Sequence, residues 1–286
     1  MTESVPEALA WKIDQATSII RKLNGVVVAL SAGVDSSLVA FLAHRALGNS
    51  AVAVTGKSES LPTEELEVAK QTANSIGIRH LVVQTSELQN PDYYSNPQNR
   101  CFFCKETLYA ELRNLADSLG LEAILDGTQA DDIGDDRPGL KAAREAGVLS
   151  PLLQASFSKA DVREAARFLG LSVWDKPAMP CLSSRVVHGE EITAEKLGMI
   201  WPAELFVKRL TGVKDLRVRY AGKTARIEVS PEDRKLFFDE NVLDQIDQEL
   251  RRLGFTKVTF DMRGYSKKDS STIGNALTLP MASMSG

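Results

Sequence analysis

The sequence has no surplus of basic charge and no long hydrophobic run. Its 286 residues carry 34 Lys and Arg against 38 Asp and Glu, a formal net charge of −4. A chain with this balance has no electrostatic field suited to holding a polyanion, which argues against extended nucleic acid as a partner. Nothing approaches the roughly 18 consecutive apolar residues of a membrane span, and the N-terminus lacks the basic start and apolar core of a signal peptide. We therefore expect a cytoplasmic protein with no membrane partner.

Cysteine is scarce as well. The chain has only Cys101, Cys104 and Cys181, an odd number that does not favour the disulfide framework of a secreted protein, and the first two form a CxxC pair. Three converging thiolates could hold a [4Fe-4S] cluster and leave one iron open to an extra sulfide that is passed to a substrate. The alternatives are a zinc site completed by His188, a Cys101–Cys104 redox disulfide with Cys181 as nucleophile, and three unconnected core thiols.

The pattern of apolar residues predicts an α/β domain. An apolar, β-branched run at 26–30 is typical of a strand buried on both faces of a parallel sheet. Strands and helices then alternate, as in a doubly wound sheet. Ser158 and Asp161 match a capping box that opens a further helix. The expected strands are 26–30, 51–55, 80–84 and 123–125, and the other expected helices are 6–23, 36–47, 63–76 and 105–119.

A smaller α+β domain is expected to follow. The segment 176–185, rich in proline and serine, is interpreted as the crossing, with the boundary near 176–190. We assign residues 1–185 to the first domain, 186–265 to the second, and 266–286 to a polar tail that we expect to be partly disordered. The predicted elements of the second domain are a helix at 194–210, strands at 216–220 and 225–229, a helix at 231–253 and a strand at 257–261.

The loop after the first strand has the composition of an anion-binding site. It contains Ser31, Gly33, Asp35, Ser36 and Ser37, and it lies between a strand and a helix N-terminus, where open α/β sheets place ligands. Backbone N–H groups and the serine hydroxyls can surround phosphate oxygens, and the glycine permits close approach of the backbone. The ending of a Walker A loop is absent, and the alternative is an ordinary turn that caps the helix.

This loop resembles the signature of the PP-loop ATP pyrophosphatase superfamily, Ser-Gly-Gly-x-Asp-Ser, with Ala32 in place of the first glycine. The difference raises the question whether position 32 needs a positive φ, which alanine tolerates poorly. Members of the superfamily cleave ATP between its α and β phosphates and transfer AMP to a carboxylate or carbonyl oxygen. The resemblance implies an ATP-binding first domain. Thr55 and Ser58, at the end of the next strand, are candidates to line the adenine.

A second loop, at 126–139, is rich in carboxylates. Asp126, Asp131 and Asp132 are the best candidates for binding the Mg²⁺ that accompanies the pyrophosphate of ATP, because this ion prefers hard oxygen ligands. Arg137 could contact a phosphate or pair with a neighbouring aspartate. The alternative is a solvated loop whose aspartates cap a helix.

Four segments together resemble the LarE family of sulfur-inserting enzymes, which serve the synthesis of the nickel-pincer nucleotide cofactor of lactate racemase. The resemblance implies an enzyme that adenylates the pyridinium carboxylates of a nicotinic acid-derived mononucleotide and converts them to thiocarboxylates. It also suggests a homo-oligomer, with a sulfur donor as a further partner. The segments are the phosphate loop, the acidic loop at 125–139, Cys-Leu-Ser-Ser-Arg at 181–185 and Leu-Arg-Val-Arg at 216–219.

The family resemblance implies two sources of sulfur. Cys181 matches a cysteine that one branch of the family sacrifices, leaving dehydroalanine. Cys101 and Cys104 match a second branch, in which a [4Fe-4S] cluster is thought to carry the sulfur, and this branch resembles the chain better.

Further site residues are implied in the second domain and its border. Arg185 and Glu204 fall on family site positions, Arg185 as a catalytic residue and Glu204 as a magnesium ligand. Arg217 and Arg219 share one face of a strand, and the family places a substrate-phosphate site there. A solvated strand face is the alternative for these two arginines.

The sequence leads to one mechanism and leaves other functions open. We expect a substrate carboxylate to attack the α-phosphorus of ATP and sulfur to displace AMP, so that substitution of Asp35 or Ser36 abolishes pyrophosphate release. A PP-loop tRNA thiolase, or another PP-loop amidating or thiolating ligase, is the nearest alternative, although no basic RNA-binding stretch is evident. A non-catalytic nucleotide-binding or electron-transfer protein would leave ATP intact.

Overall fold

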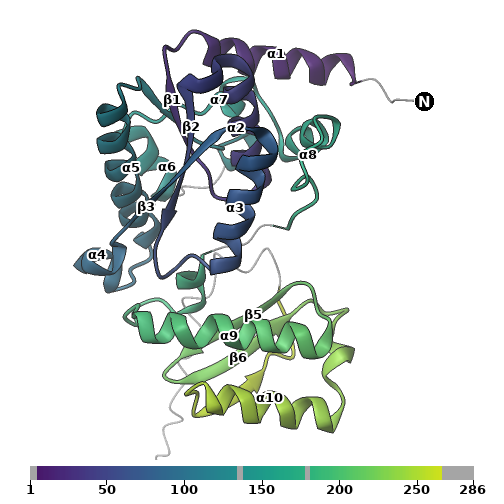
Figure 1. Cartoon of the computed structure of the whole chain (residues 1–286). Helices are drawn as coiled ribbons and strands as arrows, with labels where there is room; N and C mark the ends of the chain where they lie inside the picture. The colour runs from purple at the N-terminus through teal and green to yellow at the C-terminus, as the bar shows by residue number, and fades with distance from the viewer. Residues whose placement is uncertain (1–4, 134–137, 178–180, 266–286) are drawn as a thin grey trace, which may run out of the picture. The chain divides into compact units, whose positions relative to one another are not determined.

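The computed structural model describes residues 5–133, 138–177 and 181–265, and the chain forms two compact units, 1–181 and 182–286. The first unit is built on a four-stranded parallel sheet in the order β3-β2-β1-β4 (Figure 1). The predicted α/β fold with a parallel central sheet is therefore confirmed. The strands are β1 (Val26–Ala29), β2 (Ala51–Lys57), β3 (Arg79–Gln84) and β4 (Ala123–Leu125).

Helices cover both faces of this sheet, because successive side chains of a strand point to opposite faces. Val26 and Val28 of β1 belong to a core shared with α1, α2, α3 and α8, whereas Val27 packs on the other side with α5 and α6. The continuous valine run thus serves two cores at once. The helices of the unit are α1 (Glu7–Arg21), α2 (Val34–Leu47), α3 (Thr63–Ile76), α4 (Pro91–Tyr94), α5 (Arg100–Leu119), α6 (Pro138–Glu145), α7 (Pro151–Gln154) and α8 (Lys159–Phe168), with 3₁₀ turns η1 (Gly48–Ser50), η2 (Glu87–Gln89) and η3 (Ala130–Asp132).

The second unit is a small α+β fold with a mixed sheet in the order β5-β6-β7. β5 pairs antiparallel with β6, and β6 pairs parallel with β7. Thr193 caps the N-terminus of α9, and Gly212 ends that helix with a φ of 75°. The elements are η4 (Leu182–Arg185), α9 (Ala194–Thr211), β5 (Leu216–Ala221), β6 (Thr224–Val229), η5 (Arg234–Phe237), α10 (Glu240–Arg252) and β7 (Lys257–Phe260).

Two predicted helix starts are wrong. α5 begins at Arg100 rather than at residue 105, so the CxxC pair lies within the first turns of a helix and not before it. The predicted helix 231–253 begins only at Glu240, where the Asp239 side chain accepts hydrogen bonds from the backbone N–H groups of Asn241 and Val242. The capping box of Ser158 at α8 is present as predicted.

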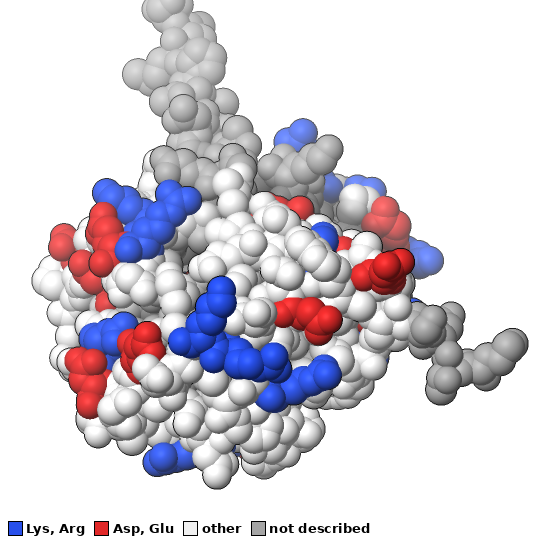
Figure 2. Space-filling model, turned by 90° about the horizontal axis from the view of Figure 1, so that it is seen from above, with Lys and Arg blue, Asp and Glu red and all other residues white. Residues whose placement is uncertain are grey.

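The surface charges and the helices of the structure bear on the composition of the chain. Basic and acidic side chains are intermixed over the face drawn in Figure 2. Among the described helices, none is both long and apolar enough to cross a bilayer. The predicted tail, 266–286, lies outside the described residues.

Candidate active site

The phosphate loop connects β1 to α2, and its backbone is shaped by Ala32. This residue has a φ of 59° and is fully buried, so the position does require the left-handed conformation that glycine adopts most easily. Gly33 is the N-cap of α2, and no described side chain caps that turn. The first N–H groups of the helix therefore remain available to an anion.

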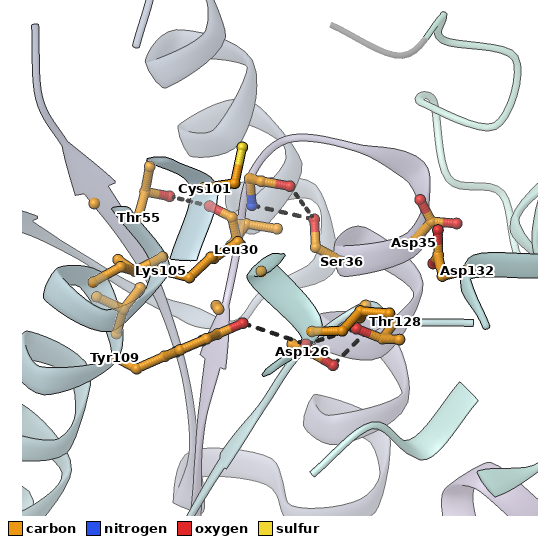
Figure 3. Close-up of a pocket in the computed structure, with 18 of the residues that line it drawn as sticks. Leu30, Asp35, Ser36, Thr55, Cys101, Lys105, Tyr109, Asp126, Thr128 and Asp132 are labelled. Atoms are coloured by element: carbon orange, nitrogen blue, oxygen red, sulfur yellow. Dashed lines mark hydrogen bonds between the residues drawn. The ribbon is translucent and has the colours of Figure 1, made fainter. Parts of the chain in front are cut away.

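The three serines of this loop have different surroundings. The Ser36 hydroxyl accepts a hydrogen bond from the Ser31 N–H at 3.2 Å and lies 3.1 Å from the Ser31 hydroxyl (Figure 3). Both serines line a cavity of about 450 Å³. Ser37 is fully buried, and its hydroxyl donates to the Gly33 carbonyl at 2.8 Å. Ser31 and Ser36 thus face the cavity, while Ser37 stabilises the turn.

The cavity lies at the carboxyl edge of the parallel sheet, where the phosphate loop, β2, β4 and α5 meet. It brings together polar phosphate-loop residues, the hydroxyl of one residue of β2, two aspartates of the acidic loop, and a thiol and an amine from α5 (Figure 3). This combination joins the predicted nucleotide site to a cysteine. The polar lining residues are Ser31, Asp35, Ser36, Thr55, Cys101, Lys105, Tyr109, Asp126, Thr128 and Asp132.

Gly127 allows the chain after β4 to approach the phosphate loop. A Cβ atom at this position would lie 2.6 Å from the backbone nitrogen of Ser36 and 2.9 Å from the carbonyl carbon of Asp35. Backbone atoms move aside at a higher cost than the end of a flexible side chain. The close approach of residue 127 to the phosphate loop therefore depends on the absence of a side chain at this position.

Asp126 is a buried anchor with several donors around it. Its carboxylate accepts hydrogen bonds from the hydroxyls of Thr128 and Ser150, each at 2.7 Å, and from Tyr109 at 3.3 Å. Burial raises the pKa of Tyr109 to about 12, so the phenol keeps its proton and remains a donor. Through these hydrogen bonds, the Asp126 carboxylate links the end of β4 to α5 and to the segment 149–150.

Two other aspartates contact Lys159, a residue that the sequence motifs do not single out. Its ammonium pairs with Asp35 at 2.5 Å, and its backbone N–H donates to Asp131 at 2.8 Å. The second oxygen of Asp35, Oδ1, is buried and accepts no hydrogen bond from any described residue. Asp132 accepts from the Gln129 N–H at 3.1 Å and lines the cavity beside Asp35. Asp35 and Asp132 therefore line the cavity together with Asp126, whose carboxylate is already bound by three hydroxyl groups.

Thr55 and Ser58 separate in the structure. Thr55 lines the cavity, and its hydroxyl donates to the Leu30 carbonyl at 2.8 Å and contacts His80 at 2.9 Å. Ser58 lies 2.9 Å from the hydroxyl of Ser60. Burial, followed by the charge of Lys70, lowers the pKa of His80, which leaves the imidazole neutral as a structural partner of Thr55. Arg137 lies outside the described residues.

Cys101, Cys104 and Cys181 form no disulfide with one another. Desolvation by the surrounding protein, and then Cys181, raise the pKa of Cys101 and of Cys104, so Cys181 lies close enough to influence both members of the CxxC pair. The Cys104 thiol also donates to the Glu87 carboxylate at 3.8 Å. Within the described residues, no three His, Cys, Asp or Glu side chains are arranged to hold a metal ion.

Lys105 is a second cavity residue that the sequence reasoning missed. It lies one helical turn after Cys101 on α5, and its ammonium stands 5.5 Å from the centre of the Tyr109 ring. The charge interaction with Tyr109, aided by Cys104 and Asp126 and opposed by burial, raises the pKa of this lysine. Lys105 is thus a stable cation in the cavity. A helix predicted from residue 100 would have placed it on the same face as Cys101.

The second unit holds the predicted arginines around two buried glutamates. Arg185 is 1% exposed and Glu204 is 0% exposed, and they form a two-point ion pair at 2.8 and 3.2 Å. Arg219 pairs with Glu228 at 2.9 Å. Arg185 thus binds both carboxylate oxygens of Glu204, the residue that was expected to bind magnesium. Arg217 lies on the same strand as Arg219 but has a different environment, described below.

Comparison with known proteins places the chain among its relatives. Residues 16–100 match the family model of asparagine synthase. The chain is 46% identical to an uncharacterized protein of Synechocystis sp., over 90% of this chain and 96% of that protein. It is 36% identical to the pyridinium-3,5-bisthiocarboxylic acid mononucleotide synthase of Lactiplantibacillus plantarum, over 90% of this chain and 92% of that protein. It is 27% identical to an uncharacterized protein of Methanocaldococcus jannaschii, over 85% of this chain and 92% of that protein.

The 36% relative covers both units, whereas the asparagine synthase match is confined to the part of the first unit that contains the phosphate loop. The resemblance that the sequence motifs carry is therefore confirmed. The chain belongs to the LarE family, that of the pyridinium-3,5-bisthiocarboxylic acid mononucleotide synthases.

Proposed function

We propose that this protein is an ATP-dependent sulfur transferase. It adenylates the pyridinium carboxylates of a nicotinic acid-derived mononucleotide and converts them to thiocarboxylates. The observation that carries the proposal is the composition of the cavity, in which Ser31, Ser36 and Asp35 of the phosphate loop share one space with the thiol of Cys101. The cavity thus contains both the loop that would bind the phosphates of ATP and a thiol that could take part in sulfur transfer.

The activation step follows from the groups around the phosphate loop. A substrate carboxylate oxygen attacks the α-phosphorus of ATP, the bond to the β-phosphate oxygen breaks, and pyrophosphate leaves. The uncapped N-terminus of α2 and the ammonium groups of Lys105 and Lys159 stabilise the negative charge that builds up. A magnesium ion bound with ATP would be held by Asp35, whose Oδ1 is buried without a described partner, and Asp132, and it would neutralise the pyrophosphate.

The sulfur step uses the adenylated carboxyl group. Sulfur attacks the carbonyl carbon and AMP leaves as the C–O bond breaks. If Cys181 is the donor, its Cα proton is then lost and its Cβ–S bond breaks, which leaves dehydroalanine in the chain and the sulfur on the product. The alternative is a sulfide carried by a [4Fe-4S] cluster on Cys101, Cys104 and Cys181. Three cysteines that form no disulfide and influence one another support this donor set, but the geometry of the described residues does not bring three ligands together.

The second unit would recognise the substrate phosphate. Arg217 and Arg219 lie two residues apart on β5, and Arg219 and Arg185 have carboxylate partners of their own. We propose residues 186–265 as the substrate domain and the first unit as the ATP-binding domain. Assembly into a homo-oligomer stays a prediction from the family.

The test is a turnover assay with the full chain purified without oxygen. ATP and the dicarboxylated mononucleotide are added, and pyrophosphate, AMP and the thiocarboxylate product are measured. We expect pyrophosphate release that depends on the mononucleotide and is lost in Asp35→Asn and Ser36→Ala. Full release in these variants would contradict the assignment of the phosphate loop, and release that instead depends on tRNA would favour a tRNA thiolase.

The source of sulfur is tested in the same preparation. Iron, labile sulfide and zinc are measured in the wild type and in a variant with Cys101, Cys104 and Cys181 replaced by serine. Iron and sulfide that disappear in the variant would support the cluster. Absence of iron, even after reconstitution, together with loss of H₂S from the mass of Cys181 after turnover, would identify a sacrificial donor.

A further inference from the structure

Arg217 is a buried cation that forms no ion pair with a described carboxylate. The residue is 7% exposed, and its Nε atom makes no hydrogen bond with any described residue. Burial, and then the positive charge of Arg185, lower its pKa, and the weaker influence of Asp215 does not offset them. Placing a charged group in such surroundings is costly unless a counter-ion arrives. The position therefore points to an anionic ligand.

Glu204 and Glu228 are already bound by other arginines, and Asp215 forms no ion pair with Arg217 among the described residues. Glu204 is bound by Arg185, and Glu228 is bound by both Arg219 and Arg226. Across this part of the sheet, four arginines face three carboxylates, Arg226 also lying 3.7 Å from Asp261. The one positive charge in excess among these described residues is that of Arg217.

The guanidinium of Arg217 lies over the ring of Tyr265. The guanidinium carbon of Arg217 is 3.9 Å from the centre of the Tyr265 ring. The backbone holds the ring there: the Tyr265 N–H donates to the Val229 carbonyl at 2.7 Å. Gly264, with a φ of 78°, makes this approach possible, because a Cβ atom at residue 264 would lie 2.5 Å from the same carbonyl oxygen.

A guanidinium that stacks on an aromatic ring keeps its N–H donors available for a ligand, whereas a guanidinium that pairs with a carboxylate does not. The ring attracts the cation through its face and restricts the guanidinium plane. The ring does not accept hydrogen bonds from the guanidinium N–H groups, because these groups point outward within the guanidinium plane. A carboxylate in the same place would use those donors and cancel the charge. The arrangement thus orients Arg217 and keeps its donors for a ligand that can accept two parallel hydrogen bonds, as a phosphate does.

We propose that Tyr265 is a positioning residue, and that the Tyr265–Arg217 stack is the element that recognises a phosphate monoester in the second unit. The proposal rests on the proposed function, which assigns Arg217 to the substrate phosphate, and it adds the residue that orients this arginine. Tyr265 contributes the face of its ring, and its hydroxyl is not required.

The experiment measures binding of D-ribose 5-phosphate and of inorganic phosphate to the full chain by calorimetry. The variants are Tyr265→Phe, which keeps the ring, Tyr265→Leu, which removes it, and Arg217→Ala. We expect Arg217→Ala to abolish binding of both probes. Tyr265→Leu should weaken binding about tenfold, and Tyr265→Phe should stay within about twofold of the wild type, as expected for loss and retention of a cation–π contact.

ATP affinity serves as the control for folding, because the phosphate loop belongs to the other unit. In turnover, Tyr265→Leu should raise the KM for the mononucleotide about tenfold and leave kcat and the KM for ATP unchanged. If Tyr265→Leu binds the probes like the wild type, or Tyr265→Phe is as weak as Tyr265→Leu, the positioning role is overturned while the phosphate site stands. If Arg217→Ala binds the probes normally, the proposed phosphate site itself is wrong.

Discussion

Replacing Lys159 with methionine separates the chemistry of the site from its stability. Lys159 is 35% exposed and pairs with Asp35, whose side chain is 25% exposed. An ion pair this close to solvent contributes about 0.2–1 kcal/mol to the free energy of unfolding. The same ammonium lies at the phosphate loop, where loss of one charged donor to a developing charge lowers the rate about 100-fold, or about 2.7 kcal/mol. The two effects differ enough in size to be measured separately.

Lys12→Met is a matched control at the same end of α8. Lys12 pairs with Asp161 of that helix at 2.7 Å, with side chains 24% and 25% exposed. Urea unfolding should show similar losses, below about 1 kcal/mol, in both variants. Pyrophosphate release should fall about 100-fold in Lys159→Met alone. Equal rates in the two variants would refute the reasoning and leave Lys159 as a structural partner of Asp35.

Three further predictions concern residues that shape the site. Ala32→Val should lower the free energy of unfolding by about 2–3 kcal/mol and weaken ATP binding, because a β-branched residue is strained at this buried position with a φ of 59°; calorimetry and urea unfolding measure both, and a neutral result would contradict the strain. Gly127→Ala should displace the backbone of Ser36 and raise the KM for ATP, whereas Gly198→Ala, which has open space around it, should leave that KM unchanged; equal values would show that the approach of the backbone does not matter. Burial raises the pKa of Glu87 above its ordinary 4.5, so the contribution of this group to stability is present below pH 4.5 and is lost as the pH rises through the raised pKa of the folded protein. The stability of Glu87→Gln relative to the wild type should therefore increase as the pH rises from 4.5, and a pH-independent difference in urea unfolding would contradict this.

The accuracy of the predicted elements followed the strength of local signals. The valine run of β1 and the capping box at Ser158 are local, and both appear in the structure as expected. The apolar pattern predicts α5 only from residue 105, whereas the helix begins at Arg100 after Asn99, whose side chain makes no cap hydrogen bond. The start of α10 did have a local signal, since Asp239 caps it, but the apolar pattern before it was extended too far.

The sequence by itself determined the type of site: a small-residue loop after a buried strand, an acidic loop at the next strand end, and three cysteines. It also raised the question of Ala32, which the backbone answers with a positive φ. These features depend on residue type, spacing and the short-range geometry of strand, turn and helix.

Only the tertiary structure decided which residues act together. Lys159 pairs with Asp35, which lies 124 positions away in the chain. The ring of Tyr265 contacts Arg217 because Gly264 lets the backbone before Tyr265 approach the Val229 carbonyl. Lys105 joins the cavity because α5 begins earlier than its sequence indicates. Such partnerships arise from the packing of elements that are distant in sequence, and no local propensity specifies them. The physical reason is that a side-chain contact depends on where two backbones are held, and that is set by the core as a whole.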